Sequence, residues 1–446
     1  MAYTNYIHRT PSSNGNRQKF TISTWVKRTD PVGQGWILTV DSYPGGNMFQ
    51  FQLDTGSYLG VQQYHGSSAQ VSVTTHNLLR DPAAWYHLVL RVDTTQSTAA
   101  DRVRIYINGT EASYNNTTYP SQNFEFQVNH VTKQSINSRE DNSSGKSLYF
   151  SHYHLCDGYS YAPTEFGETD ATTGEWKIKT DPSVSYGTNG FFIFKNGMNL
   201  SGSTVQDQSG QSNNLTLVGS SDETKDNPDN NFATLKSLGH ASASFTLIEG
   251  NLYSGGADNN WRSIFGTLGA IAGKYYYEVK IIGTANEHIG IASADQIAKC
   301  SDSAGKFTDS TYGTEGYAYT NGGQKSNNGT DTNWGNSYTT NDIIGVALDL
   351  DNSKIYFSKN GTFQESGDPT SGSTGTGAAY TLVANKFYLP AMASYGGASN
   401  MAFNFGNGYF RTTAVSSAGT NASGHGVFEY DVPTGYTALC TKGLNE

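Results

Sequence analysis

Alternation of apolar and polar residues is clearest in two segments of this chain, at 85–109 and 342–361. Each segment has an alternating strand, a polar turn, a second alternating strand and an Asn-Gly pair. The first copy is WYHLVLRVD followed by DRVRIYINGT, and the second is DIIGVALDL followed by NSKIYFSKNGT. A period of two is that of a β-strand, not a helix. We therefore predict two hairpins, each ending in an Asn-Gly turn with positive φ angles.

The alternation also assigns the two faces of each hairpin. Val89 is the one mismatch in the first segment, because it is apolar at an outward position. The predicted inward positions are Tyr86, Leu88, Leu90, Val92, Val103, Ile105 and Ile107 in the first segment, and Ile344, Val346, Leu348, Leu350, Ile355 and Phe357 in the second.

Similar strands recur along most of the chain, and we predict an all-β fold of two antiparallel β-sandwich (jelly-roll) domains in tandem. The first domain is expected at 1–200 and the second at 232–446. Between them, 201–231 contains SGSTVQDQSGQSNN and SSDETKDNPDNN, which is the composition of a polar linker. A length of 446 residues is enough for two such domains.

Composition narrows the possible functions. Charged residues make up 15% of the chain, the formal net charge is −10, and no Lys/Arg cluster stands out. These features argue against nucleic-acid binding, which needs a concentrated positive surface. Three isolated cysteines, Cys156, Cys300 and Cys440, predict neither a disulfide framework nor a zinc site. No run of about 18 apolar residues predicts a membrane span, and the N-terminus lacks the apolar region of a secretory signal.

Two known domain families resemble the two blocks. The first block resembles the laminin-G-like, concanavalin A-like jelly rolls in FTISTWVKR (20–28), WYHL (85–88) and VRIYING (103–109). The second is similar to SPRY domains in GKYYYEVKI (273–281), HIGIAS (288–293) and its hairpin at 342–361.

The chain as a whole resembles virion proteins of marine tailed bacteriophages. This resemblance rests on the order of the two domains and on the segments FGETDATTGEWKIK (166–179) and VPTGYTALCTKGL (432–444). The resemblance implies a non-enzymatic protein of the virion surface, a fibre or receptor-binding component. Such a protein would be made in the host cytoplasm, be released by lysis, and bind other virion proteins and a host-surface glycan or protein. It also allows a homotrimer, although no heptad repeat supports one. The first strands begin close to Met1, so no anchoring segment is evident.

Two alternatives remain open, a capsid decoration protein without a receptor role and a polysaccharide-degrading enzyme. A retaining glycosidase needs two carboxyl groups about 5–5.5 Å apart, and no E-x-D-x-x-E run supplies them. Asp349 and Asp351 have same-face spacing but lie at a predicted turn. His152 and His154 share a strand face without an obvious third metal ligand. We therefore predict no cofactor, and calcium stays open because Asp/Asn loops are common while no EF-hand spacing occurs.

Loop aromatics are the better candidates for ligand binding, because Tyr and Trp rings stack on the apolar faces of sugars and add a polar handle. Their alternative role is packing over the ends of the sheets. The candidates are Trp36 and Tyr43 in the first block and Tyr312, Trp334 and Tyr338 in the second.

Overall fold

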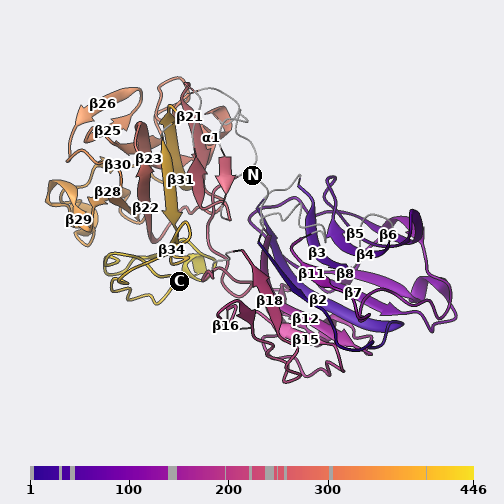
Figure 1. Cartoon of the computed structure of the whole chain (residues 1–446). Coiled ribbons are helices and arrows are strands. Elements are labelled where there is room, and N and C mark those ends of the chain that lie inside the picture. The colour runs from indigo at the N-terminus through magenta and orange to yellow at the C-terminus, as the bar shows by residue number, and fades with distance from the viewer. Residues whose placement is uncertain are drawn as a thin grey trace. The chain divides into compact units, whose positions relative to one another are not determined.

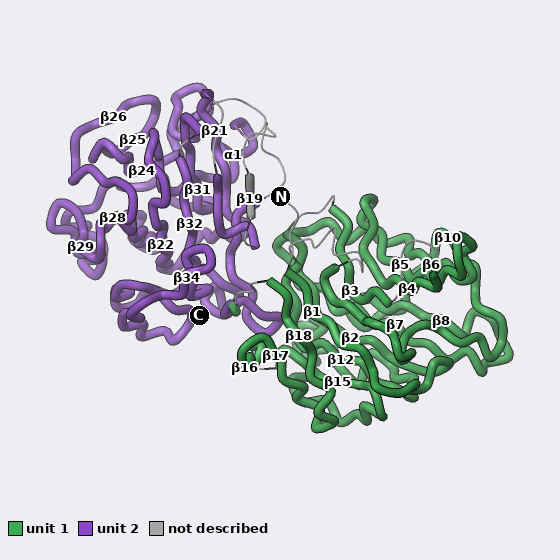
Figure 2. The backbone as a smooth tube through the Cα atoms, viewed as in Figure 1, with its two compact units in different colours: residues 1–223 green, residues 224–446 purple. Residues whose placement is uncertain are grey.

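The computed structural model describes residues 5–29, 33–40, 46–138, 148–195, 197–219, 223–236, 246–248, 250–255, 259–300, 305–397 and 399–445. The chain divides into two compact units, residues 1–223 and 224–446 (Figure 2). Each unit is built from two large sheets whose strands pair almost entirely in antiparallel fashion (Figure 1). The predicted all-β fold of two jelly-roll domains in tandem is therefore confirmed. Within the described ranges, no helix is long and apolar enough to cross a bilayer.

Unit 1 contains a ten-stranded and a six-stranded sheet. The larger sheet has the spatial order β10 (Tyr114–Thr118), β6 (Ser68–Leu78), β5 (Tyr58–His65), β4 (Asn47–Leu53), β3 (Gly35–Val40), β11 (Gln134–Ile136), β1 (Tyr6–Arg9), β18 (Leu215–Val218), β17 (Thr204–Val205) and β16 (Leu200–Ser201). The smaller sheet has the order β15 (Phe191–Ile193), β12 (Leu148–Asp157), β2 (Lys19–Arg28), β7 (Trp85–Asp93), β8 (Val103–Ile107) and β9 (Thr110–Glu111). Outside these sheets lie the hairpin of β13 (Gly167–Thr169) and β14 (Trp176–Ile178) and the 3₁₀ turns η1 (Ala99–Asp101) and η2 (Pro163–Glu165).

The core of unit 1 lies between its two sheets, and the inward positions of the first hairpin belong to it. Leu88, Leu90, Val92, Val103 and Ile105 are fully buried in one apolar cluster, and Tyr86 and Ile107 pack against it. Val89 is also buried but lies outside this cluster. A second, smaller cluster of Cys156, Phe166, Tyr186 and Phe192 also lies outside the main core.

Unit 2 has the same plan with a nine-stranded and a six-stranded sheet. The larger sheet runs β19 (Thr246–Ile248), β20 (Tyr253–Gly255), β32 (Asn400–Asn404), β22 (Lys274–Gly283), β27 (Ile343–Asp349), β28 (Lys354–Lys359) and β29 (Thr362–Phe363), with β30 (Tyr380–Thr381) beside β28 and β35 (Thr437–Ala438) beside β22. The smaller sheet runs β21 (Arg262–Phe265), β31 (Tyr388–Tyr395), β23 (Asn286–Ser293), β24 (Gly316–Thr320), β25 (Gln324–Asn327) and β26 (Thr330–Asn333). The remaining elements are the hairpin of β33 (Tyr409–Phe410) and β34 (Thr413–Ala414), helix α1 (Ala294–Cys300), and the 3₁₀ turns η3 (Gln364–Ser366), η4 (Gly372–Thr374) and η5 (Gly443–Asn445).

The two Asn-Gly turns have the backbone geometry predicted for them. The φ angles are 47° and 79° at Asn108 and Gly109, and 49° and 80° at Asn360 and Gly361. In each turn the asparagine Oδ1 accepts a 2.8 Å hydrogen bond from a backbone N–H of the neighbouring strand. The two hairpins therefore share their turn chemistry although they belong to different units.

An aromatic ring from a distant part of the unit also packs against each turn glycine. A Cβ atom on Gly109 would lie 2.5 Å from the ring of Trp176, and one on Gly361 would lie 2.6 Å from the ring of Tyr430. Such distances are too short for any side chain, so the absence of a Cβ is required for packing as well as for the positive φ angle.

The segment predicted as a polar linker, 201–231, differs from that description in the structure. It contains β17 and β18, and β18 lies between β1 and β17 near one end of the ten-stranded sheet. Val205 and Leu215 are buried in the core of unit 1. Two buried apolar side chains are enough to fix short edge strands, even where the surrounding composition is that of a loop. The boundary between the compact units falls after Glu223.

The C-terminal segment of unit 2 covers one face of the nine-stranded sheet, and Phe428 packs there in an apolar cluster. It is held by Glu278 of β22, whose carboxylate accepts hydrogen bonds of 2.9 Å from the backbone N–H groups of both Glu429 and Tyr430. Asn404 Nδ2 donates a further bond of 3.2 Å. Burial raises the pKa of Glu278 to about 7, and these hydrogen bonds oppose the shift.

Candidate ligand-binding site

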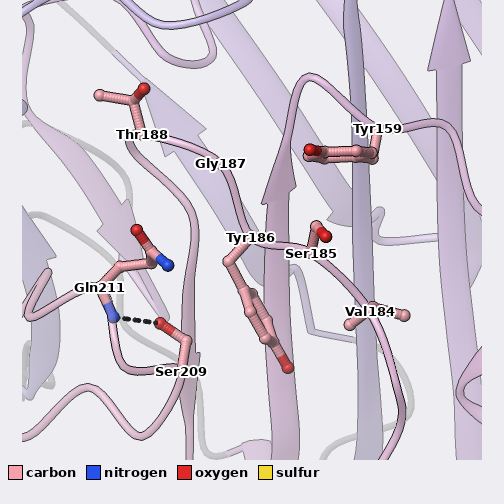
Figure 3. A pocket seen from close by; sticks show the side chains of 8 residues that line it. All are labelled: Tyr159, Val184, Ser185, Tyr186, Gly187, Thr188, Ser209 and Gln211. Carbon is pink, nitrogen blue, oxygen red and sulfur yellow. Dashed lines mark hydrogen bonds between the residues drawn. The ribbon is translucent and has the colours of Figure 1, made fainter.

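A pocket of about 450 Å³ opens on unit 1 beside the end of β12. Three segments far apart in the sequence form it: the loop after β12, residues 184–188, and the turn between β17 and β18 (Figure 3). Its lining residues are Tyr159, Val184, Ser185, Tyr186, Gly187, Thr188, Ser209 and Gln211.

The loop after β12 is fixed by hydrogen bonds to the sheet beneath it. Gly158 has a φ of 85°, which turns the chain away from the strand. Thr21 Oγ1 on β2 donates to the carbonyl of Tyr159 at 2.9 Å and accepts from the N–H of Tyr161 at 2.8 Å. Arg91 Nε on β7 donates to Ser160 Oγ at 2.9 Å. Three hydrogen bonds therefore hold the backbone of this loop, and with it the two tyrosines, against the sheet.

Tyr159 and Tyr161 form a stacked pair at the rim of the pocket. Their ring centroids are 5.5 Å apart and their planes are inclined by only 7°. Tyr161 is anchored from behind, because its hydroxyl accepts a 2.9 Å hydrogen bond from the N–H of Ser185 and its ring packs on Phe166. Tyr159 remains 40% exposed. A fixed, exposed tyrosine ring of this kind suits stacking against a flat apolar surface.

Tyr186 belongs to the buried wall of the pocket. Its hydroxyl lies 2.9 Å from Nδ1 of His154, and its ring stacks on that of Phe192. Burial holds the pKa of His154 well below its usual range, and the neighbouring His152 and His87 lower it further. The imidazole is therefore neutral near neutral pH and serves the packing of this wall.

A buried carboxylate, that of Asp157, organises the loops around the pocket. It accepts hydrogen bonds from the N–H of Asn16 at 2.7 Å, from Nδ2 of Asn129 at 3.0 Å and from the N–H of Asn189 at 2.9 Å. Gly187 passes so close that a Cβ atom there would lie 2.1 Å from the carbonyl oxygen of Asp157. Asp157 thus positions the 186–190 segment without belonging to the pocket lining.

The opposite wall is a polar turn. Ser209 donates from both its N–H and its hydroxyl to the carboxylate of Asp207, and the N–H of Gln211 donates to Ser209 Oγ at 3.2 Å (Figure 3). Gln211 and Thr188 add an amide and a hydroxyl to the residues that line the pocket. The lining therefore combines one exposed aromatic ring with uncharged donors and acceptors, and it contains no carboxylate.

The aromatic residues predicted to bind ligand occupy other places. Tyr43 lies outside the described residues. Trp36 is a strand residue of β3 with 2% exposure, and Tyr312 is 9% exposed. Tyr338 is 3% exposed, and its hydroxyl donates to two backbone carbonyls. Trp334 is partly buried and packs against the main core of unit 2. The described candidates are therefore packing residues, which was the alternative role considered for them.

The sequence signal for the pocket lay elsewhere, in Gly158-Tyr-Ser-Tyr-Ala-Pro directly after a strand. A glycine after the last strand residue and a proline soon after the second tyrosine mark a loop, which leaves the intervening tyrosines candidates for exposure. The partners of this loop at 184–188 and 209–211 have no distinguishing pattern, so the pocket itself was not predictable.

The structure also places the histidines and the aspartate that could have carried catalysis or bound a metal. A β-bulge separates Ser151 from His154, and His152 has a φ of 47°, so the two histidines do not follow simple strand alternation. Asp349 is buried, pairs with Lys274 at 3.1 Å and caps the hairpin turn. In the described portion of the chain, no group of three or more His, Cys, Asp or Glu side chains is arranged to hold a metal ion.

Comparisons with known proteins agree with the two-domain description. Residues 2–146 match the concanavalin A-like lectin/glucanases superfamily, and residues 274–408 match the SPRY domain. The chain therefore contains a laminin-G-like, concanavalin A-like domain followed by a SPRY domain.

Individual relatives cover only parts of the chain. It is 35% identical over 101 residues to the ATP-dependent RNA helicase DDX1 of Xenopus laevis, which is 23% of this chain and 12% of the helicase. The SPRY domain of human HERC1 is similar at 16% identity with a TM-score of 0.28, covering 36% of this chain and 91% of that domain. A heptameric SAP-like pentraxin from Limulus polyphemus is similar at 12% identity with a TM-score of 0.27, covering 35% of this chain and 71% of the pentraxin.

Proposed function

We propose that this chain is a non-enzymatic binding protein of a virion surface that recognises a host-surface glycan through the pocket of unit 1. The observation that carries the glycan assignment is the fixed, exposed ring of Tyr159 beside uncharged hydroxyl and amide groups. Sugars present apolar C–H faces to aromatic rings and hydroxyls to polar groups, so this lining suits a neutral saccharide.

The non-enzymatic part of the proposal is supported by the chemistry of the pocket. Hydrolysis of a glycosidic bond uses a pair of carboxyl groups on either side of that bond. The lining offers none, and the two carboxylates beside it, those of Asp157 and Asp207, are engaged by backbone, amide and hydroxyl donors. The arrangement supports binding by stacking and hydrogen bonding.

The virion placement rests on the sequence resemblance, in which the two domains occur in the order found in tailed-phage surface proteins. Other virion proteins would then bind elsewhere on the two units. Immunogold labelling of purified particles with antibodies against the chain tests this placement. Particles without label would refute it, whereas labelled particles whose protein binds no glycan would favour the alternative of a decoration protein.

Tyr159→Ala tests the glycan site. We expect roughly a tenfold loss of affinity for the host polysaccharide, equivalent to about 1.4 kcal/mol, with an unchanged melting temperature, because the ring is exposed. Tyr395→Ala is the matched control, since Tyr395 is 37% exposed in unit 2. Calorimetric titration checks both variants, and equal binding by wild type and Tyr159→Ala would exclude this pocket as the binding site.

A further inference from the structure

Three hairpins in the two units turn on the same tripeptide, Asn-Gly-Thr. The tripeptides begin at Asn108, Asn328 and Asn360 and lead into β9, β26 and β29. The backbone is alike in all three turns, with φ angles of 47° and 79° at the first Asn-Gly pair, 50° and 72° at the second, and 49° and 80° at the third. Each asparagine is also exposed. The three turns are therefore matched in sequence and conformation, and they differ in what holds them.

The turns at Asn108 and Asn360 are held by side-chain hydrogen bonds and covered by aromatic rings. Oδ1 of each asparagine accepts a 2.8 Å bond from a backbone N–H of the neighbouring strand. Nδ2 of Asn360 also donates to Asp342 at 2.7 Å. The rings of Trp176 and Tyr430 pack against the two glycines. These contacts fix each carboxamide and cover the glycine that follows it.

The turn at Asn328 lacks both kinds of contact. Among the described residues, no group hydrogen-bonds to the carboxamide of Asn328. The atom that a Cβ on Gly329 would meet first is Ser310 Oγ, at 3.3 Å, and not an aromatic ring. One backbone hydrogen bond holds the tip of this turn, from the N–H of Gly329 to the carbonyl of Thr308 at 2.7 Å.

The other described Asn-Gly pairs in the chain are anchored as well. Each of their asparagine side chains makes at least one hydrogen bond to the backbone, at Asn14, Asn189, Asn321 and Asn407. Asn196, which also precedes a glycine, lies outside the described residues. Of the Asn-Gly pairs that the structure describes, only the one at Asn328 therefore has an unanchored side chain.

We propose that Asn328 is a deamidation site, at which the folded protein acquires an aspartate or isoaspartate with time. The nitrogen of Gly329 attacks Cγ of Asn328, and the new N–C bond closes a five-membered succinimide ring. The Cγ–Nδ2 bond breaks, and Nδ2 leaves as ammonia with the proton that the glycine nitrogen has lost. Water then opens the ring at either carbonyl. Glycine favours this attack because it has no side chain to hinder the approach. The inference is independent of the proposed function.

The hydrogen bond between Gly329 and Thr308 opposes the reaction, because the nitrogen must be released before it attacks. The strand that follows, β26, is exposed along its whole length and forms the edge of its sheet. Opening this tip therefore exposes little apolar surface, and such regions open at low free energy. At Asn108 and Asn360 the carboxamide must also leave its backbone partner, and an aromatic ring must move. The cost of opening each turn thus places Asn328 first.

Deamidation changes the tip of this hairpin in charge and in length. It adds one negative charge beside a strand that already has Asp331, which pairs with Lys306 at 3.5 Å. The isoaspartate product also lengthens the backbone by one methylene group between β25 and β26, next to the bond from Gly329 to Thr308. The modification therefore alters the surface of unit 2 at one defined place.

The test compares the three Asn-Gly-Thr sites within the full chain, kept folded in mildly alkaline buffer or, in parallel, unfolded in urea. Digestion under mildly acidic conditions and mass spectrometry give the converted fraction at each site, and fragment ions separate Asn328 from Asn327. In the folded chain Asn328 should convert at least about tenfold faster than Asn108 and Asn360, equivalent to about 1.4 kcal/mol. In urea the three rates should become similar, because the reacting tripeptide is the same.

Anion-exchange chromatography gives a second readout, since each conversion adds a negative charge. Asn328→Gly, which the positive φ angle tolerates, should abolish the first acidic product, and the matched control Asn360→Gly should retain it. Conversion of Asn328 in the folded chain that is no faster than that of Asn108 or Asn360 overturns the proposal. A difference that persists unchanged in urea also overturns it, because the fold would not be its cause, and so does a first acidic product that survives in Asn328→Gly.

Discussion

Replacing Glu278 with glutamine should change how the stability of unit 2 depends on pH. Glu278 is fully buried on β22 and accepts hydrogen bonds from two consecutive N–H groups of the covering C-terminal segment. Tyr276 donates its hydroxyl to the same carboxylate at 3.3 Å. Because no cation neutralises the carboxylate among its described hydrogen-bond partners, the buried negative charge is costly, and the protonated form is favoured.

The magnitude follows from the shift in pKa. The folded-state pKa of Glu278 is about 7, against 4.5 for an unperturbed glutamate. A raised folded pKa means that the folded state retains its proton while the unfolded state loses it, so stability falls as pH rises between these two values. At 1.36 kcal/mol per pKa unit, the full loss is about 3 kcal/mol. Glutamine does not titrate, so the Glu278→Gln variant lacks this contribution.

Hydrogen exchange followed by mass spectrometry measures the effect locally, in peptides that contain the amides of Glu429 and Tyr430. Between pH 4.5 and 8, after correction for the intrinsic exchange rate, the opening free energy of these peptides should fall by about 3 kcal/mol more in the wild type than in Glu278→Gln. The two proteins should be similar at the acidic end, where both side chains are neutral. A difference that stays constant across this range would refute the argument, because it would mean that Glu278 titrates alike in the folded and unfolded states.

Two further predictions concern the two hairpins. Leu90→Asp and Val346→Asp should each unfold their own unit, because an unpaired charge in an apolar core costs several kcal/mol; thermal melts of wild-type stability for both would contradict the face assignment. Gly109→Ala should destabilise unit 1 by more than Gly66→Ala in urea titrations. Both glycines have positive φ angles, which cost alanine about 1–2 kcal/mol, but only Gly109 lies against Trp176, while Gly66 faces open space. Equal losses of unfolding free energy in the two variants would show that the contact between Gly109 and Trp176 adds nothing to the cost of the alanine.

Strand alternation was sufficient to predict the hairpins, because it depends only on neighbouring residues. Leu90 and Val346 alternate with polar positions, and both are fully buried. The Asn-Gly turns were predictable for the same reason, since the φ angles of Asn108 and Asn360 are local properties. The short strands around Val205 and Leu215 were not predictable, because their burial comes from pairing with a strand at the other end of the unit.

The sequence by itself determined the fold class, the two-domain organisation and the turns, since hydrophobic periodicity and positive-φ residues act over a few neighbouring positions. Which aromatic rings are exposed was decided only by the tertiary structure. Trp36 follows a Gly/Pro-rich stretch and Tyr338 lies among polar residues, yet both are buried. Tyr159, by contrast, is exposed at a pocket formed by three separate segments. Exposure depends on what packs against a side chain across the sheets, and that information lies far from the residue in sequence.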